Sequence, residues 1–269
     1  MNRKRIILFL SAVLSLCIFA GAAEPSEKVL RVLAYNIKHG QGMDGKVDVE
    51  RIARVIKAQQ PDLVALQEVD KHCRRSSNQD IAARLGELLG MEHRFGKAIP
   101  FQGGEYGNAV LSRLPIKSAT THALPKSSEP RAALEVVVEV QGKPMSFVSL
   151  HLERNSGGQR NAQTKALVEL FTERPHPVIL AGDYNAARWS EPMKVLTDAG
   201  WDILKKNDGK DIRTFHGEKK RADSATTARV EIDYLVVRGL PKAKITHGVI
   251  PEEMASDHRP IYGVFEWAK

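Results

Sequence analysis

Short apolar segments with strand-forming residues recur from Val29 to the C-terminal region, and helix-forming segments separate several of them. These segments are Val29–Tyr35, Asp62–Leu66, Ala133–Val140, Met145–Leu150, Val178–Ala181, Ile232–Val237 and Ile261–Phe265. Gln141-Gly142-Lys143 joins two of them as a hairpin, so antiparallel and helical crossover connections occur together. Because no Pro/Gly/Ser-rich linker interrupts the series, the pattern predicts one domain of two packed sheets with helices outside.

Three helices are predicted from apolar residues at helical spacing. Asp48 can cap the first, which Pro61 ends, and Asn78 can cap the second, which Gly90 stops. The third follows the hairpin. Their apolar positions are Ile52, Val55 and Ile56; Ile81, Leu85, Leu88 and Leu89; and Ala166, Leu167, Leu170 and Phe171.

A basic patch and an apolar run at the N-terminus predict an export signal. Arg3, Lys4 and Arg5 precede the apolar stretch Ile6–Ala20, and Ala20-Gly21-Ala22 supplies the small residues of a cleavage site. The alternative is a membrane anchor, but the run is shorter than the ~20 residues that span a bilayer. We therefore expect a signal peptide over residues 1–22, a single domain over 23–269, and a secreted or periplasmic protein.

The charge of the mature chain limits the classes of ligand only weakly. The net charge of the whole sequence is +8, and the three basic residues of the export signal leave +5. This excess is smaller than that of most nucleic-acid binders, and it is compatible with an anionic substrate without identifying one. Cys73 becomes the only cysteine, so no disulfide can form within the chain and the core must stabilise the fold.

Polar residues recur close to the points where the apolar strands are predicted to stop. They are Asn36, Gln67-Glu68, Asn108, His151, Asp183 with Asn185, Asp233, and Asp257-His258. A strand end can hold a side chain on a rigid scaffold at the edge of a cleft. Asn and Asp singly are common turn formers, but the recurrence favours a functional site. Carboxylate and amide oxygens suit Mg²⁺ or Mn²⁺ better than Zn²⁺.

Five of these segments, in this order, resemble the signature of the endonuclease/exonuclease/phosphatase superfamily. They are Leu33-Ala34-Tyr35-Asn36-Ile37, Leu66-Gln67-Glu68-Val69, Gly182-Asp183-Tyr184-Asn185, Ile232-Asp233-Tyr234 and Ser256-Asp257-His258-Arg259-Pro260. Each motif alone is weak, whereas five in order are specific, and the resemblance runs from about Val29 to the C-terminus. It implies a small secreted bacterial-type member with the DNase I-like fold. This fold is a four-layer α/β sandwich of two packed mixed β-sheets flanked by helices.

The resemblance also implies roles for individual residues. Glu68 resembles the principal metal ligand, with Asn36 beside it, and Asp257 resembles a further metal-site or water-positioning carboxylate. Asp183 resembles the residue that orients or deprotonates the attacking water. Asn185, two positions on, would donate a hydrogen bond to a phosphate oxygen.

Two histidines and a tyrosine complete the implied catalytic set. His258 would bind the phosphoryl oxygens, while Asp233 orients its imidazole and favours its charged form. His151 matches a general acid that protonates the leaving oxygen in some family members. Tyr106 resembles a phosphate-contacting tyrosine. His151 and Tyr106 also have a simpler interpretation, in which the histidine bonds a backbone carbonyl and the tyrosine packs.

Further residues are candidates for phosphate binding. Asn108 follows Tyr106 in the same short motif, and Arg131 lies just before a predicted strand in Glu129-Pro130-Arg131-Ala132. Arginine suits phosphate because its planar fork binds two oxygens. Four other arginines are weaker candidates, because such residues are more often solvated surface charges; they are Arg74, Arg75, Arg154 and Arg160.

The implied reaction is in-line attack of an activated water on the phosphorus of a phosphodiester or phosphomonoester, with Mg²⁺ or Mn²⁺ as cofactor. The substrate could be a nucleic acid, a phospholipid head group, or a sugar or inositol phosphate. Alternative functions are a nonspecific secreted nuclease, a sphingomyelinase-like lipid phosphodiesterase and an inactive binding module. The inactive module would be expected to lack Glu68, Asp183 or His258, which are present. We expect a monomer with no obligate protein partner.

Overall fold

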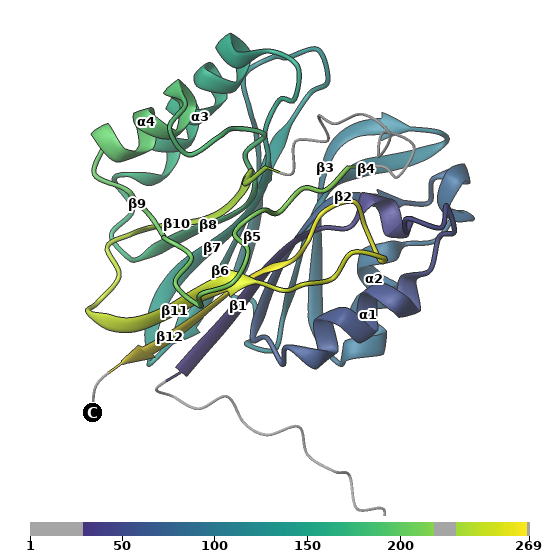
Figure 1. Cartoon of the computed structure of the whole chain (residues 1–269), viewed down its shortest axis with the longest axis horizontal. Coiled ribbons are helices and arrows are strands. Elements are labelled where there is room, and N and C mark those ends of the chain that lie inside the picture. Colours follow the sequence, from purple (N-terminus) through teal and green to yellow (C-terminus); the bar gives the residue numbers. More distant parts are fainter. Residues whose placement is uncertain (1–28, 218–229, 268–269) are drawn as a thin grey trace, which may run out of the picture.

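The computed structural model describes residues 29–217 and 230–267. Within these residues, twelve strands form two six-stranded sheets that pack against each other, and helices cover both outer faces (Figure 1). The predicted signal peptide, residues 1–22, lies outside the described residues. Among the helices that are described, none has the length and apolar character needed to cross a membrane.

The first sheet has the strand order β11-β12-β1-β2-β4-β3. Its strands are β1 (Val29–Asn36), β2 (Leu63–Lys71), β3 (Glu92–Phe101), β4 (Gly104–Ser112), β11 (Ala243–Val249) and β12 (Ile261–Trp267). The pair β1 and β2 is parallel, and the other neighbouring pairs are antiparallel. A parallel pair requires a crossover connection, which here contains α1 (Val49–Ala58).

The second sheet repeats this mixed arrangement with the strand order β5-β6-β7-β8-β10-β9. Its strands are β5 (Ser118–Ala123), β6 (Ala132–Val140), β7 (Lys143–His151), β8 (Val178–Asp183), β9 (Asp202–Ile203) and β10 (Asp233–Arg238). Strands β7 and β8 are parallel, and α3 (Gly157–Phe171) lies in their crossover connection. The neighbouring pairs on either side are antiparallel.

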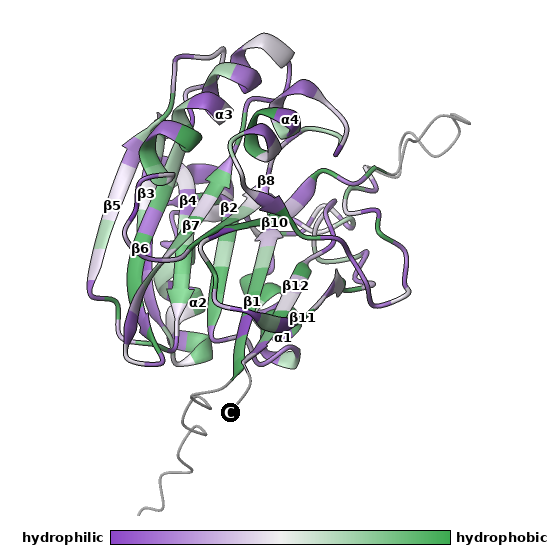
Figure 2. Cartoon of the chain, turned by 90° about the vertical axis from the view of Figure 1, so that its left-hand side faces the viewer, coloured by the Kyte–Doolittle hydropathy of each residue, from purple (hydrophilic) through white to green (hydrophobic). Residues whose placement is uncertain are grey.

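Three apolar clusters hold the layers together. The central cluster joins the two sheets and includes Val32 and Leu63 from the first sheet and Phe147 and Ile179 from the second. A second cluster packs α1 and α2 (Ile81–Leu89) on the first sheet, and a third packs α3 and α4 (Glu191–Asp198) on the second. Figure 2 shows hydrophobic residues concentrated along the strands. The predicted four-layer α/β sandwich of two mixed sheets is therefore confirmed.

The helix starts follow capping chemistry, with one correction to the sequence prediction. The side chain of Asp48 accepts a hydrogen bond from the backbone N–H of Arg51 at the start of α1, as predicted. Helix α2 is capped by Asp80, whose side chain accepts from the N–H of Ala83, and not by Asn78. Asn78 has a φ of 57°, whereas an N-cap residue needs extended backbone.

Several of the selected polar residues do not lie at strand ends as predicted. Strand β2 continues past Glu68 to Lys71, through an irregularity of register between Leu66 and Val69. Asn108 lies inside β4, and Asp233 opens β10. A β-bulge bends one strand and re-aims its side chains, so Glu68 is presented by a bulge and not by the end of a strand.

Candidate active site

The register of three neighbouring strands brings His151, Asp183 and Asp233 side by side. In the parallel pair β7 and β8, His151 lies opposite Asp183, and in the antiparallel pair β8 and β10, Asp183 lies opposite Asp233. Residues paired in register point to the same face of a sheet. The second sheet therefore delivers one histidine and two carboxylates to a single place.

Glycine is required immediately before Asp183. Gly182 has a φ of 150°, and a Cβ added there would lie 2.1 Å from the backbone oxygen of Leu150. A side chain would therefore push β7 and β8 apart at the point where His151 and Asp183 meet. This close approach accounts for the glycine of the Gly182-Asp183-Tyr184-Asn185 motif.

The first sheet contributes Asn36 and Glu68, which meet the second sheet at Asp183. The Asn36 amide nitrogen Nδ2 donates to Glu68 Oε1 at 3.1 Å and to Asp183 Oδ2 at 3.2 Å. Glu68 has a φ of 58° at the bulge, and its side chain is half-buried between the buried residues Gln67 and Val69. The backbone conformation thus turns this carboxylate out of the core.

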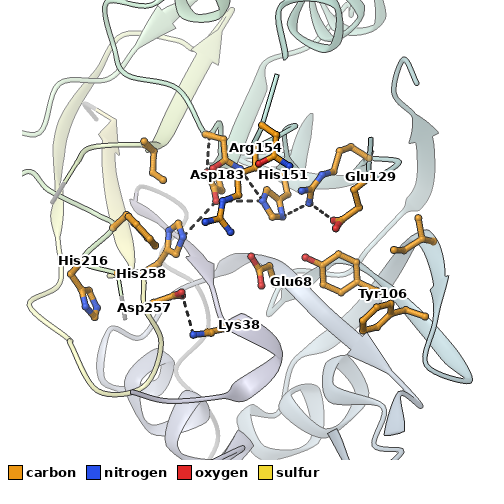
Figure 3. Close-up of a pocket in the computed structure, with 18 of the residues that line it drawn as sticks. Lys38, Glu68, Tyr106, Glu129, His151, Arg154, Asp183, His216, Asp257 and His258 are labelled. Carbon is orange, nitrogen blue, oxygen red and sulfur yellow. Dashed lines mark hydrogen bonds and ion pairs between the residues drawn. The ribbon is translucent and has the colours of Figure 1, made fainter. Parts of the chain in front are cut away.

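A cavity of about 710 Å³ opens at this end of the sandwich. Figure 3 shows Asp183 between His258 and His151, with Glu68 facing them from the other side. Most of the predicted site residues line it: Glu68, Tyr106, Arg131, His151, Asp183, Asn185, Asp257 and His258. Asn36 and Asp233 are buried behind this surface and contact residues that line it. The structure therefore brings nearly all of the predicted site together.

His258 lies among carboxylates. Its Nδ1 is 3.0 Å from Asp233 Oδ2, its Nε2 is 3.7 Å from Asp183 Oδ2, and the ring of Phe215 packs 4.9 Å away. Burial by itself lowers the pKa of His258, but the neighbouring charges of Asp233 and Asp183 outweigh it and raise this pKa to about 10. His258 is therefore held in its charged form at neutral pH, as expected from the sequence.

His151 lies among cationic and hydrogen-bond-donating groups. Its Nδ1 is 2.9 Å from Arg131 Nη1, and its Nε2 is 3.1 Å from Asn185 Nδ2 and 3.5 Å from Asp183 Oδ2. Burial lowers the pKa of His151 well below its usual value, and the charges of Arg131 and His258 lower it further. The general-acid role of His151 stays a prediction, and it requires the ring to carry the proton that it gives away, whereas these neighbours favour the neutral ring.

Asp183 is shared by both histidines. Its Oδ1 accepts a hydrogen bond of 2.8 Å from the backbone N–H of Asn185. Burial and the nearby charge of Asp233 raise the pKa of Asp183 to about 7, although His258 and Asn185 act in the opposite direction. A carboxylate whose pKa is close to the working pH is suited to accept a proton from water.

Glu68, Asn36 and Asp257 offer hard oxygen ligands on the opposite side of the cavity. Burial raises the pKa of Glu68, and the charge of Asp257 raises it further. Asp257 also pairs with Lys38, whose Nζ lies 3.4 Å from its Oδ2. A divalent cation would stabilise the charge of Glu68 beside this second carboxylate, so these residues fit Mg²⁺.

The described residues contain a second group of possible metal ligands, Asp183, Asp233 and His258. Their ligand atoms lie within 4.8 Å of one another. In this group, however, His258 bonds Asp233 and is held positively charged. A charged imidazole has no free lone pair for a metal. We therefore interpret this group as a hydrogen-bonded relay.

Arg75 and Tyr106 form the far wall of the cavity together with Ile99 and Phe101. The Arg75 guanidinium donates two hydrogen bonds of 2.8 Å to Asp70 and lies 4.5 Å from the centre of the Phe101 ring. The Tyr106 ring is 5.4 Å from the same guanidinium. This wall, which we call the aromatic shelf, is Ile99, Phe101, Tyr106 and Arg75.

The other arginines divide into two kinds. Arg131 and Arg154 line the cavity, whereas Arg160 donates to the backbone oxygens of Glu153 and Arg154. Arg74 is exposed and is not part of the cavity wall. Arg131, the best of the predicted arginines, is 7% exposed and contacts His151 directly.

Asn108 does not line the cavity. Its Nδ2 donates to the backbone oxygen of Ala132 at 2.8 Å and lies 3.5 Å from that of Ser149, both in the second sheet. Gln67 makes a similar connection by donating to the hydroxyl of Ser149 at 3.0 Å. The phosphate-binding role predicted for Asn108 therefore does not fit its contacts, because its amide nitrogen joins the two sheets beneath the site.

Four residues for which sequence reasoning predicted no role hold the site in place. Ser256 donates to the backbone oxygen of Asn36 at 2.7 Å, and Thr214 accepts from the backbone N–H of Asp233 at 3.1 Å. Lys38 pairs with Asp257. It follows Asn36 by two positions, so its place directly after a motif could have identified it. Phe215 comes from a loop without a recognisable motif.

Comparison with known proteins agrees with this site. The model of the endonuclease/exonuclease/phosphatase family matches residues 33–258, and the chain belongs to that family. Members of this family are hydrolases that act on phosphoesters. YbhP from Escherichia coli strain K12 is 29% identical over 199 residues, which cover 69% of this chain and 78% of YbhP.

Solved structures show the same fold. An endonuclease/exonuclease/phosphatase protein of Beutenbergia cavernae has a TM-score of 0.72 and 23% identity, over 90% of this chain and 72% of that one. A mannosyl-6-phosphatase of Bacteroides thetaiotaomicron has a TM-score of 0.70 and 19% identity, over 88% of this chain and all of its own. At these identities the likeness concerns the fold alone.

Proposed function

We propose that the protein is an exported, Mg²⁺-dependent phosphoesterase that hydrolyses a phosphodiester or phosphomonoester by in-line attack of water. The observation that carries this proposal is the position of Asp183 between two histidines, His258 and His151, facing Glu68 across the cavity. A base, a cation and a carboxylate for metal binding are thereby gathered around one space.

The chain's own residues have separate tasks in this reaction. Asp183 accepts the proton of the attacking water, since its pKa of about 7 permits a large ionised fraction at neutral pH. His258 stabilises negative charge on the phosphoryl oxygens, and Asp233 holds its imidazole in place. Asn185 Nδ2 donates to a phosphoryl oxygen from the same side.

Glu68 with Asn36 would hold the metal ion, and Asp257 lies close enough to Glu68 to influence its charge. When bound, Mg²⁺ would supply positive charge to the phosphate and compensate these carboxylates. The low exposure of Asn36 supports a fixed position for the ligand set.

The organic part of the substrate would lie on the aromatic shelf. A cavity of about 710 Å³ is in the range of sites for whole small molecules and leaves space beyond a phosphate group. Tyr106, a member of the shelf, lies beside Glu68 in Figure 3. Burial raises the pKa of its hydroxyl group, and the charge of Glu68 raises this pKa further. The bacterial phosphatase of the same fold makes sugar phosphates part of the substrate search.

The decisive experiment is a substrate screen of the exported protein with Mg²⁺ and with EDTA. The panel would contain bis-p-nitrophenyl phosphate, p-nitrophenyl phosphate, sphingomyelin, inositol and sugar phosphates, and single- and double-stranded DNA. We expect EDTA to abolish activity, Mg²⁺ or Mn²⁺ to restore it, and Glu68→Gln to raise the metal requirement strongly. Glu129→Gln is the matched control, since Glu129 lines the same cavity but pairs with Arg131. Full activity in EDTA would exclude the metal-dependent reaction.

Export is a separate part of the proposal. The basic patch, the apolar run and the small residues at Ala20-Gly21-Ala22 support a mature N-terminus near Ala23. Mass spectrometry of protein from the periplasm or medium would measure that terminus. Recovery of Met1 to Ala22 in a membrane fraction would indicate an anchor instead.

A further inference from the structure

Arg75 reaches the cavity from a buried anchor. Its Nε donates to Asp70 Oδ2 and its Nη2 donates to Asp70 Oδ1, both at 2.8 Å. The side chain of Asp70 is completely buried, whereas that of Arg75 keeps 27% of its surface exposed and lines the cavity. Because each carboxylate oxygen accepts a hydrogen bond from Arg75, one edge of the guanidinium is held in a fixed orientation.

The backbone and two aromatic rings hold the same residue. The backbone N–H of Arg75 donates to Gln102 Oε1 at 3.0 Å, in the turn between β3 and β4. The ring centres of Phe101 and Tyr106 lie 4.5 Å and 5.4 Å from the central carbon of the guanidinium. Aromatic faces attract a guanidinium. A side chain held in this way loses little conformational freedom when it binds a ligand, which favours binding.

The other edge of the guanidinium has donors without acceptors. A guanidinium has five N–H donors, and two of them bond Asp70, so three remain, two on Nη1 and one on Nη2. In the part of the chain that the structure describes, none of these three donates to a protein acceptor. A planar edge of parallel N–H groups matches the paired oxygens of a carboxylate or a phosphate.

Strand pairing connects this anchor to the residue that would hold the metal. Asp70 follows Glu68 by two positions on β2, so their Cα atoms are about 6–7 Å apart. Asp70 also lies opposite Tyr106 in the pair of β2 and β4. Figure 3 shows the hydroxyl group of Tyr106 directed toward Glu68. Arg75 is therefore anchored beside the reaction site, at a distance that a short organic group can span.

We propose that Arg75 forms a second anion-binding subsite, and that the substrate is a phosphoester whose organic part carries a further phosphate or carboxylate group. The second anion would accept hydrogen bonds from Nη1 and Nη2 of Arg75, while the reacting phosphate lies beside Glu68 and Asp183. Arg75 thus determines specificity and takes no part in the chemical step. The proposal rests on the proposed phosphoesterase function and names its substrate class.

The test measures binding, with probes that cannot be hydrolysed. Propylphosphonate carries one anionic group, propane-1,3-bisphosphonate adds a second phosphonate, and 4-phosphonobutyrate adds a carboxylate. Isothermal titration calorimetry in Mg²⁺ would compare the three. We expect the protein to bind one or both of the two-anion probes roughly 10–100-fold more tightly than propylphosphonate. The probe that gains more affinity identifies the second anion as a phosphate or a carboxylate.

Variants assign this preference to Arg75. Arg75→Gln should remove the preference and leave the affinity for propylphosphonate close to that of the unaltered protein. Arg74→Gln is the matched control, because Arg74 is the exposed neighbour in sequence and is not part of the cavity wall, so the preference should stay. Arg75→Gln leaves the buried Asp70 without its partner, which can destabilise the fold. The double variant Asp70→Asn/Arg75→Gln removes both charges and should lose the preference as well.

The outcomes separate the subsite from the reaction. Equal affinity of the unaltered protein for one-anion and two-anion probes overturns the proposal. A loss by the same factor for all three probes in Arg75→Gln also overturns it, because Arg75 then only supports the aromatic shelf. If the protein prefers two-anion probes but hydrolyses no phosphoester in the substrate screen, the proposed function fails and the subsite stands. Hydrolysis without this preference supports the function and removes the subsite.

Discussion

A histidine lies on each side of Asp183, and the neighbours of these two histidines have opposite charges. His258 contacts the carboxylates of Asp233 and Asp183, and its pKa is raised to about 10. His151 contacts Arg131 and the Asn185 amide, and its pKa is lowered well below the ordinary value. Both histidines are almost inaccessible to solvent, with 5% and 4% of their surfaces exposed, so burial alone does not explain the difference.

The comparison teaches that neighbouring charges decide the protonation of a buried histidine. Burial lowers the pKa of both rings, because it penalises the charged form. Two carboxylates reverse this effect at His258, and a guanidinium adds to it at His151. One flank of Asp183 thus supplies a cation, while the other supplies a neutral imidazole. Each of the following experiments removes one part of that contrast.

The largest effect should come from removing the charged ring. His258→Ala should reduce kcat/KM by at least roughly 10²–10⁴-fold on both alkyl and aryl esters, because charge on the phosphoryl group forms with every leaving group. Steady-state kinetics on the two ester types would measure it. His216→Ala is the control, since His216 lines the cavity without an Asp233 contact, and its loss should be much smaller. Retention of activity within tenfold of the unaltered protein would remove His258 from the mechanism.

A smaller effect should follow from weakening the charge of His258 while keeping its ring. Asp233→Asn removes the carboxylate that lies 3.0 Å from Nδ1, so the pKa of His258 should fall. We expect a loss of about 10–100-fold, by analogy with the loss found when the outer carboxylate partner of a metal-bound histidine is removed. The alkaline limb of the pH–rate profile should move to lower pH. Asp233→Glu should restore part of both, and an unmoved alkaline limb would contradict the assignment.

The two histidines should also act in opposite directions on stability. The folded pKa of His258 lies above the unfolded value of 6.5, so its contribution is present below pH 6.5 and is lost as pH rises toward about 10. The folded pKa of His151 lies below 6.5, so stability is lost as pH falls below 6.5, where only the unfolded chain takes the proton. Within each window, one histidine changes the free energy of unfolding by up to about 1.4 kcal/mol per pH unit.

Urea unfolding across pH would measure these slopes. Asp233→Asn should flatten the alkaline decline, and His151→Gln should flatten the acidic one. Each variant should leave the other limb as it is in the unaltered protein. If both variants change the same limb, the assignment of a charged ring to His258 and a neutral ring to His151 is wrong.

The smallest effect should come from the exposed cation on the His151 flank. Arg154 lines the cavity, and its charge contributes to the lowered pKa of His151 only after burial, Arg131 and His258. Solvent screens exposed charges, which contribute about 0–1 kcal/mol, so Arg154→Gln should change kcat/KM by less than about fivefold. Arg131→Gln should change it more. A larger loss for Arg154→Gln would show that charge, and not the hydrogen bond from Arg131, controls the His151 flank.

Much of the fold was predictable because its signals are local. The strands from Val29 and from Val178, the Asp48 cap and the hairpin at Gly142 depend on residues close together in the chain, and the structure has them. The positions of Glu68 and Asn108 were harder to predict from the sequence. The bulge in β2 and the contact of Asn108 with the second sheet depend on how the strands pair. The spacing of apolar residues along the chain does not indicate this pairing.

The sequence by itself determined which chemical groups this protein has and, through five ordered motifs, the family and the fold that hold them. Only the tertiary structure decided the state of those groups. Asp233 and His258 are 25 positions apart, Arg131 and His151 are 20 apart, and Asn36 and Asp183 are 147 apart. Charge interactions and hydrogen bonds act over a few ångströms in space, whatever the separation along the chain. For this reason one of two histidines that look alike in the sequence is charged in the folded site and the other is neutral.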